Sequence, residues 1–164
     1  MPRHAEVVHS VWIEAPVAIV RAQFADLDHH ISANVHPKLQ FEVLSRDADS
    51  ARFVQTVRLL GIRQRDVFER RIQADGSIED RSVEGFNKGG TLSFQFQTEI
   101  AGGRTGTRVE ITIRLPLPPL IGRLVQPLLE AQVRKEVTAA AEEDRADIEQ
   151  RGYPRTASAR ALAA

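Results

Sequence analysis

Apolar residues recur every three or four positions along the C-terminal part of the chain. They fall on one face of a helix, and their main positions are Ile121, Val125, Leu129, Val133 and Val137, with Leu128, Ala140, Ala141 and Ile148 beside them. Charged residues fill the other face, and Gly152 follows as a stop signal. From Pro127 to Arg151 such a helix is roughly 37 Å long at ~1.5 Å per residue. A helix of this length with one apolar face predicts a broad surface for it to lie against.

Upstream of this helix, apolar and polar residues alternate as in half-buried strands. The first run covers residues 6–14, and Pro16 then suits the first turn of a short helix that ends at residues 26–28. A second short helix is expected at 31–35, because the residue before Pro37 disfavours helical backbone. The chain therefore begins with one strand and two short helices.

About six further strands are predicted, beginning near residues 39, 53, 62, 78, 92 and 109. Short turns separate them, and Asp75-Gly76 is the strongest hairpin signal among these turns. Regular strands joined by short turns favour antiparallel pairing. Helices and strands that are segregated in this way define the α+β class, with one long helix laid across an antiparallel sheet.

Composition narrows the classes of function. Lys plus Arg equals Asp plus Glu, at 22 each, so no global field favours nucleic acid or an anionic membrane. The chain has no cysteine, which excludes disulfides, thiolate nucleophiles and Cys-ligated metals. No secretory h-region and no stretch of ~18 apolar residues is present, so we expect no transmembrane segment and a cytoplasmic protein. The sequence leaves the oligomeric state open.

A local motif resembles a known family. Ile13-x-Ala15-Pro16-x-x-x-Val20, followed by Phe24 and Asp26, is similar to the strand-to-helix entry of the START/Bet v 1-like (SRPBCC) superfamily. The resemblance is to its polyketide cyclase/dehydrase and lipid-transport group. Arg21 departs from the pattern, since members often carry an aromatic residue there. Residues 115–137, LPLPPLIGRLVQPLLEAQVRKEV, also resemble the proline-rich lead into the family's long helix.

The resemblance covers roughly residues 4 to 151 and implies a helix-grip fold. In this fold a curved antiparallel sheet of about seven strands wraps around the long C-terminal helix, with a cavity between them. We therefore expect a single domain over residues 1–151 and a flexible tail over 152–164. Members of the family commonly hold lipids, polyketides or similar molecules in the cavity, and some catalyse cyclisation or dehydration.

A cavity of this kind predicts ligand contacts from the sheet, the short helices and the long helix. The predicted contacts are His9, Val11, His30, His36, Phe41, Phe53, Gln55, Asp66, Phe68, Phe94, Phe96, Ile121, Val125, Leu128 and Leu129. For any single apolar residue among them, plain core packing is the competing interpretation. His9 likewise is either a satisfied core histidine on the first strand or a group presented to a ligand.

Three histidines, His29, His30 and His36, lie in one short stretch with Asp26 and Asp28. They suit a polar or acid–base cluster at the mouth of a cavity, or else a solvated loop. Their spacing matches no helical H-x-x-x-H arrangement, and adjacent histidines diverge on most backbones. We therefore expect no metal site, and nothing else in the sequence points to a cofactor.

Asp66 and Arg70 share one face of the strand from 62 to 72 with Gln64 and Phe68. If this face points inward, Asp66 needs a partner, for which Arg70, Gln55 and His9 are the candidates. Such a network orients a ligand or forms an acid–base pair with a shifted pKa. The alternative is that the polar residues face water.

The leading hypothesis is binding or transport of a hydrophobic or amphipathic small molecule in an internal cavity. The alternative is a polyketide cyclase/dehydratase-like enzyme, in which a cavity His or Asp moves protons and Arg70 or Arg81 steadies enolate charge. That alternative requires a titratable pair that faces the cavity within hydrogen-bond reach. A third class, a partner-binding protein, predicts a collapsed interior and an exposed apolar patch. No catalytic residue and no particular ligand is assigned by the sequence.

Overall fold

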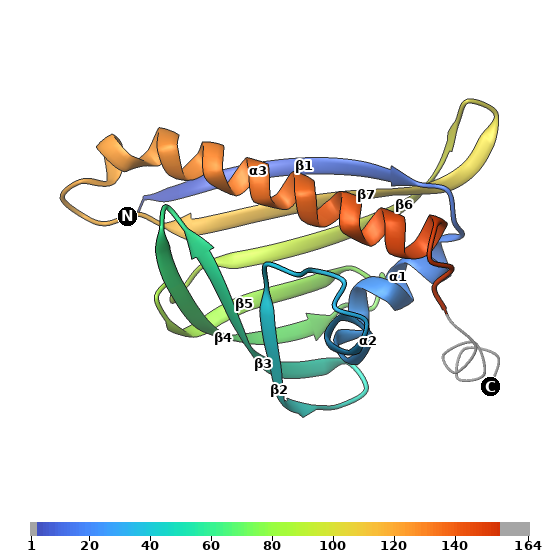
Figure 1. Ribbon diagram of the computed structural model, residues 1–164, viewed down its shortest axis with the longest axis horizontal. Coiled ribbons are helices and arrows are strands. Elements are labelled where there is room, and N and C mark those ends of the chain that lie inside the picture. The colour runs from blue at the N-terminus through green and yellow to red at the C-terminus, as the bar shows by residue number, and fades with distance from the viewer. Residues whose placement is uncertain (1–2, 155–164) are drawn as a thin grey trace.

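Seven strands form one antiparallel sheet in the order β1-β7-β6-β5-β4-β3-β2, and a long helix crosses it (Figure 1). The computed structural model describes residues 3–154. The strands are β1 His4–Ile13, β2 Gln40–Arg46, β3 Ser50–Leu59, β4 Ile62–Ile72, β5 Ile78–Gly85, β6 Thr91–Ala101 and β7 Arg104–Pro116. The helices are α1 Val17–Ala25, α2 Leu27–Ser32 and α3 Gly122–Glu149. The predicted α+β arrangement is confirmed.

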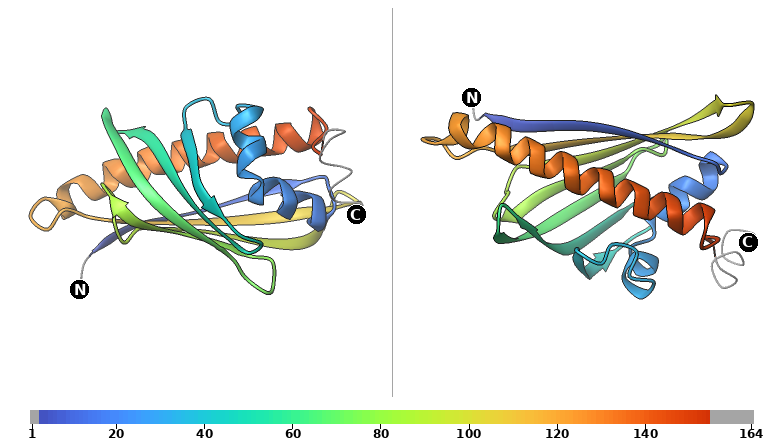
Figure 2. Two further views of the ribbon diagram at one scale, coloured as in Figure 1. Left: turned by 90° about the horizontal axis from the view of Figure 1, so that it is seen from below. Right: turned by 45° about the horizontal axis from the view of Figure 1, so that its top comes forward.

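The sheet bends around α3, which lies beside β1, while β2 and β3 come round on the helix's other side (Figures 1 and 2). The short helices α1 and α2 close the end of the sheet next to the C-terminal half of α3 (Figure 1). This is the helix-grip arrangement expected from the sequence. No helix within residues 3–154 is long and apolar enough to cross a membrane.

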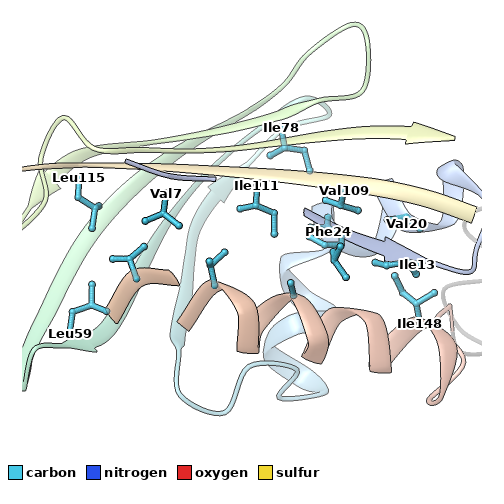
Figure 3. Close-up of a cluster of buried hydrophobic side chains, with 14 of the residues drawn as sticks. Val7, Ile13, Val20, Phe24, Leu59, Ile78, Val109, Ile111, Leu115 and Ile148 are labelled. Atoms are coloured by element: carbon cyan, nitrogen blue, oxygen red, sulfur yellow. The ribbon is translucent and has the colours of Figure 1, made fainter. Parts of the chain in front are cut away.

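The core lies between α3 and the strands at the β1 edge of the sheet. Val7 and Ile13 of β1 and Val109 and Ile111 of β7 point toward the helix, as Figure 3 shows. Ile148 meets them from α3 (Figure 3). The alternation that predicted β1 is therefore the alternation that fills the core.

The second short helix starts earlier than predicted, for a local reason. Helix α2 begins at Leu27 rather than Ile31, because the Asp26 side chain accepts a hydrogen bond from the His29 backbone N–H and caps it. Helix α3 begins at Gly122, close to Ile121 where the predicted apolar face starts, and Pro127 lies inside its second turn. Pro127 is the sixth residue of α3, beyond the four backbone N–H groups that lack intrahelical partners, so its missing N–H removes one hydrogen bond of the helix.

Some apolar residues at the N-terminal end of α3 face away from the sheet. Ile121 and Leu128 are 53% and 63% exposed, so the prediction that they line the inner side of the helix is wrong. The first turns of α3 lie at the rim of the sheet (Figure 1). Leu128 precedes the buried Leu129 by one residue, which rotates it about 100° around the helix, away from the core.

The chain after α3 folds back on the short helices. Gly152 has a positive φ of 72°, and the next residue, Tyr153, is buried and donates from its hydroxyl to Asp26 Oδ2 over 3.1 Å. The predicted tail of residues 152–164 thus starts with a packed side chain. Residues 155–164 lie outside the described residues.

Candidate functional site

A cavity of about 170 Å³ lies between α3 and the inner face of the sheet. Its walls are mainly aromatic and aliphatic, and polar side chains from α2, β4 and α3 contribute to them. Of the predicted ligand contacts, those that line it are His30, His36, Phe41, Phe53, Gln55, Asp66, Phe68 and Phe94. These residues come from α2, the loop after it, and β2, β3, β4 and β6.

The other predicted contacts lie elsewhere. Val11 and Leu129 are in the core, Phe96 and Val125 pack against it, and His9 is half-buried on β1 opposite Ile111. The exposed residues Ile121 and Leu128 do not line the cavity either. The physical reason is that the β1 edge packs directly on α3, which leaves space only where the sheet curves away toward β2.

Several wall residues were not predicted from the sequence. They are charged or polar, and they include Lys38, Asn87, Glu136, Glu143 and Asp144. For Asp144 a signal exists, since it follows Ala141 by three residues on the same apolar face of the helix. A carboxylate at a core position of an amphipathic helix indicates a buried partner.

The buried histidines converge on Asp144. His30 Nε2, from α2, lies 3.0 Å from Asp144 Oδ1, and His36 Nε2, from the following loop, lies 3.3 Å from the same oxygen. The two imidazole rings stack with their centroids 5.1 Å apart. The other nitrogen of each ring also has a hydrogen-bond partner. His30 Nδ1 lies 2.8 Å from the Asp26 carbonyl oxygen, and His36 Nδ1 lies 2.8 Å from Glu143 Oε2. The alternative of a solvated loop is therefore wrong for His30 and His36.

Further hydrogen bonds connect the short helices α1 and α2 to α3. Gln23 of α1 donates from Nε2 to Asp144 Oδ1 over 2.9 Å and to Asp147 Oδ2 over 3.2 Å. His29 Nε2 lies 2.6 Å from Asp147 Oδ2. Gln23 and Asp147 are fully buried, so these bonds satisfy groups that have no access to water.

Within the cluster, the pKa values of His36 and Asp144 are shifted in opposite directions. Burial opposes a charge on His36, but the carboxylates of Asp144 and Glu143 outweigh it and raise the pKa of His36 to about 9. For Asp144 burial acts in the opposite direction, and the nearby His36 and His30 more than offset it, so the pKa of Asp144 lies well below its usual range. Near neutral pH the cluster thus contains a buried ion pair on the cavity wall.

Arg70 faces the cavity, but its guanidinium is already paired with a carboxylate. Its Nε and Nη2 donate to Asp80 Oδ1 and Oδ2 over 2.7 and 2.8 Å, and its Nη1 donates to the Phe24 carbonyl over 3.0 Å. The guanidinium also lies over the Phe53 ring, 5.3 Å from its centroid. Its charge is neutralised by Asp80, so it is not free to steady a ligand anion. The other candidate, Arg81, is solvent-exposed and bonds to Glu79.

Asp66 points inward, but none of the three predicted partners binds it. Its Oδ1 accepts from Ser82 Oγ at 3.0 Å and the Asn87 backbone N–H at 2.6 Å, and its Oδ2 accepts from Asn87 Nδ2 at 2.9 Å. The strand face that carries Gln64, Asp66 and Arg70 is therefore the inner face. Gln55 also lines the cavity, and its side chain forms no hydrogen bond with any described residue. It is the polar group best placed to bind a guest.

Comparison with solved structures identifies the fold. TTHA0849 from Thermus thermophilus superposes with a TM-score of 0.77 at 20% identity, covering 90% of this chain and 99% of that one. The Zhui aromatase/cyclase from Streptomyces sp. R1128 gives 0.68 at 18% identity, with 92% and 99% covered. A START superfamily protein from Mycobacterium smegmatis gives 0.66 at 15% identity, with 85% and 95% covered.

The fold is thus that of START/Bet v 1-like proteins, which include aromatase/cyclases, as the resemblance in the sequence implied. At these identities the likeness concerns the fold and not the activity. No protein-family model matches the sequence, and no curated protein is similar to it in sequence.

Proposed function

We propose that this chain binds and carries a compact hydrophobic or amphipathic molecule in the cavity beneath α3. The observation that carries the proposal is the cavity itself, with aromatic and aliphatic walls and a few convergent polar groups. This combination is the usual composition of small-molecule sites. Removing apolar ligand surface from water supplies affinity, at about 2.5 kcal/mol per ~100 Å². The free side chain of Gln55 and the His36–Glu143 pair then orient the polar end of the guest.

The size of the cavity favours a small guest. Its volume of about 170 Å³ is close to that of an engineered ~150 Å³ apolar cavity that binds benzene, and below the ~300–1,000 Å³ of pockets for drug-sized ligands. A molecule built around a single ring fits these dimensions. A long acyl chain or a multi-ring polyketide requires the cavity to widen, and the exposed Lys38, 3.8 Å from Glu136 on the wall, marks the side open to solvent.

The test begins with native mass spectrometry of protein purified from its own host, which shows whether a small molecule co-purifies and gives its mass. A panel of monocyclic aromatic acids, fatty acids and sterols is then screened by the rise in melting temperature. We expect single-ring compounds to raise it most. If repeated preparations are empty and no compound in the panel raises it, the proposal is wrong.

A matched pair of variants locates the binding. Ala140 lines the cavity, whereas Ala131 is exposed on the outer side of the same helix. Ala140→Phe fills the space and is expected to abolish the ligand-dependent rise in melting temperature. Ala131→Phe places the same ring in solvent and is expected to retain it. Equal behaviour of the two variants would exclude the cavity as the binding site.

A second candidate function, a cyclase/dehydratase-like enzyme, is favoured by one observation. His36 and Glu143 lie 2.8 Å apart and both line the cavity, which is the titratable pair that this hypothesis requires. In such an enzyme the His36 imidazolium donates a proton to a leaving hydroxyl and Glu143 accepts the proton of the neighbouring carbon, so that water is eliminated, while Arg70 has no role because Asp80 neutralises it. Product formation from small β-keto compounds, absent in His36→Gln, would support catalysis. Ligand retention without turnover supports carriage.

The third class, a partner-binding protein, required a collapsed interior. The cavity weighs against it. Leu120, Leu124 and Leu128 at the start of α3 are nevertheless exposed, as that class also predicted.

A further inference from the structure

The two histidines at Asp144 have too few hydrogens for all of the hydrogen bonds that their ring nitrogens face. A carbonyl or carboxylate oxygen can only accept, so the Nδ1 atoms of His30 and His36, which face Asp26 O and Glu143 Oε2, both carry hydrogen. A neutral imidazole has one N–H, so both Nε2 atoms then present lone pairs. When both rings are neutral, both lone pairs point at the same carboxylate oxygen, at 3.0 and 3.3 Å. Either two additional protons or one divalent cation removes this repulsion.

The spacing of these atoms suits a cation. The three ligand atoms all lie within 4.8 Å of one another. Zn–N and Zn–O bonds of ~2.0–2.2 Å at a tetrahedral angle separate neighbouring ligand atoms by about 3.3 Å. Two of the three separations here, 3.0 and 3.3 Å, are near this value without any movement of the chain.

The surroundings have the organisation of a metal site as well. Metal-binding histidines usually donate their other ring N–H to a carbonyl or a carboxylate, which fixes the ring and its tautomer. His30 has the carbonyl of Asp26, and His36 has the carboxylate of Glu143. These contacts leave Nε2 as the free ligand atom of each ring.

A third observation concerns Gln23, whose amide also lies at Asp144. Its Nε2 is 2.9 Å from Asp144 Oδ1, and its Oε1 is buried without a hydrogen-bond partner among the described residues. A buried oxygen of this kind lacks a donor. Water bound to a cation at Asp144 is a donor of the required kind.

We propose that His30 Nε2, His36 Nε2 and Asp144 Oδ1 bind one divalent transition-metal ion on the wall of the cavity. Two imidazoles and one carboxylate are the donor set of catalytic zinc sites and of the facial triad that binds ferrous iron. The negative charges of Asp144 and Glu143 balance the ion. All three ligand residues line the cavity. The remaining coordination positions of the ion therefore face the space that a guest occupies.

The sequence predicted no metal because the H-x-x-x-H spacing concerns only ligands that are close together in the chain. Asp144 lies 114 positions from His30 and comes from the opposite side of the cavity. The bound ion would polarise a carbonyl or carboxylate oxygen of the guest, which favours oxygenated ring compounds over pure hydrocarbons. The proposal does not depend on the carrier function, because the metal can be measured without any organic molecule.

The test uses the full chain, stripped with a chelator, and titrates it with Zn²⁺ in a calorimeter and with Co²⁺ in a spectrophotometer. We expect one equivalent per chain and the visible bands of low-coordinate Co²⁺. His36→Gln removes one ligand and is expected to lower the affinity at least 100-fold. Glu143→Ala removes only the group that orients His36, for which a loss of about 10–100-fold is expected. His9→Gln removes a histidine outside the cluster and is expected to bind as the unaltered chain does.

Each outcome decides the proposal. Absence of stoichiometric binding for both ions means that the cluster is a protonated hydrogen-bond network only, and overturns it. So does binding that survives His36→Gln, or binding that His9→Gln weakens equally, since either result places the ion elsewhere. Circular dichroism confirms that each variant is folded. If His36→Gln does not fold, Glu143→Ala and His30→Gln answer the same question.

Discussion

Arg70 on β4 and Asp80 on β5 are register partners and form a two-pronged ion pair that is almost fully buried. The register shift between Val67 and Phe68 places them opposite each other. This pair neutralises the charge of Arg70 on the cavity wall. As a result, the cluster around Asp144, rather than Arg70, holds the titratable chemistry of the site.

The Arg70–Asp80 pair gives a first prediction. Asp80→Asn leaves a buried guanidinium without its counter-charge, and we expect the free energy of unfolding to fall by about 3–5 kcal/mol. Urea denaturation measures this loss. Arg70→Met combined with Asp80→Leu removes both charges and is expected to cost clearly less than Asp80→Asn. A loss below ~1 kcal/mol for Asp80→Asn would show that the pair is hydrated.

Neighbouring leucines on α3 give a second prediction. Leu129 is 8% exposed and Leu128 is 63% exposed, although both belong to the same apolar segment of the sequence. Leu129→Ala leaves a cavity in the core and is expected to cost about 2–5 kcal/mol of unfolding free energy. Leu128→Ala is expected to change it by at most ~0.5 kcal/mol. Similar losses in the two variants would contradict the observed orientation of α3.

Gly85, next to Asp66, gives a third prediction. Its φ is 118°, and a Cβ there would lie 2.3 Å from the Arg65 carbonyl oxygen, which is backbone and does not move aside. Gly85→Ala is therefore expected to lower the denaturation midpoint and to disturb the Asp66–Asn87 bonds. Gly89 has a φ of 91° with no atom within 4 Å of its added Cβ, so Gly89→Ala carries only the cost of backbone strain, about 1–3 kcal/mol. If Gly85→Ala lowers the free energy of unfolding no more than Gly89→Ala does, then β4 and β5 do not approach each other as closely at Gly85 as the structure shows.

The titration of His36 gives a fourth prediction, for protein kept free of metal with a chelator. Burial opposes its charge, but Asp144 and Glu143 of α3 raise its pKa to about 9 from 6.5. The titratable groups that face it are these two carboxylates and the stacked ring of His30 of α2. Because the folded pKa is raised, its contribution to stability is fully present below pH 6.5 and is lost as the pH rises through about 9.

That contribution is at most roughly 3 kcal/mol, taking 1.36 kcal/mol per pKa unit. Denaturation between pH 6 and 10 measures it, and His36→Gln is expected to remove the corresponding fall in stability. His9→Gln lies outside the cluster and is expected to keep it. A fall of the same size in His36→Gln would assign the effect to other groups.

Local patterns account for most of what was predicted about the fold. Alternation in residues 6–14 and the hairpin at Asp75-Gly76 act between neighbours in the chain, so they predict strands and antiparallel pairing without tertiary information. The Ala15-Pro16 motif and the long amphipathic helix then gave the class of fold. The prediction failed where a side chain decided the boundary, as at Asp26, whose cap starts α2 at Leu27 instead of the predicted Ile31.

The sequence by itself determined the strands and the order of the helices, because periodicity and turn chemistry are local properties. Only the tertiary structure decided which polar groups meet. Asp66 binds Asn87 instead of Arg70, and His30 and His36 converge on Asp144, because strand register and helix rotation bring together residues that are far apart in the chain. Pairing between buried charges depends on geometry of a few ångströms, which no pattern of hydrophobicity encodes.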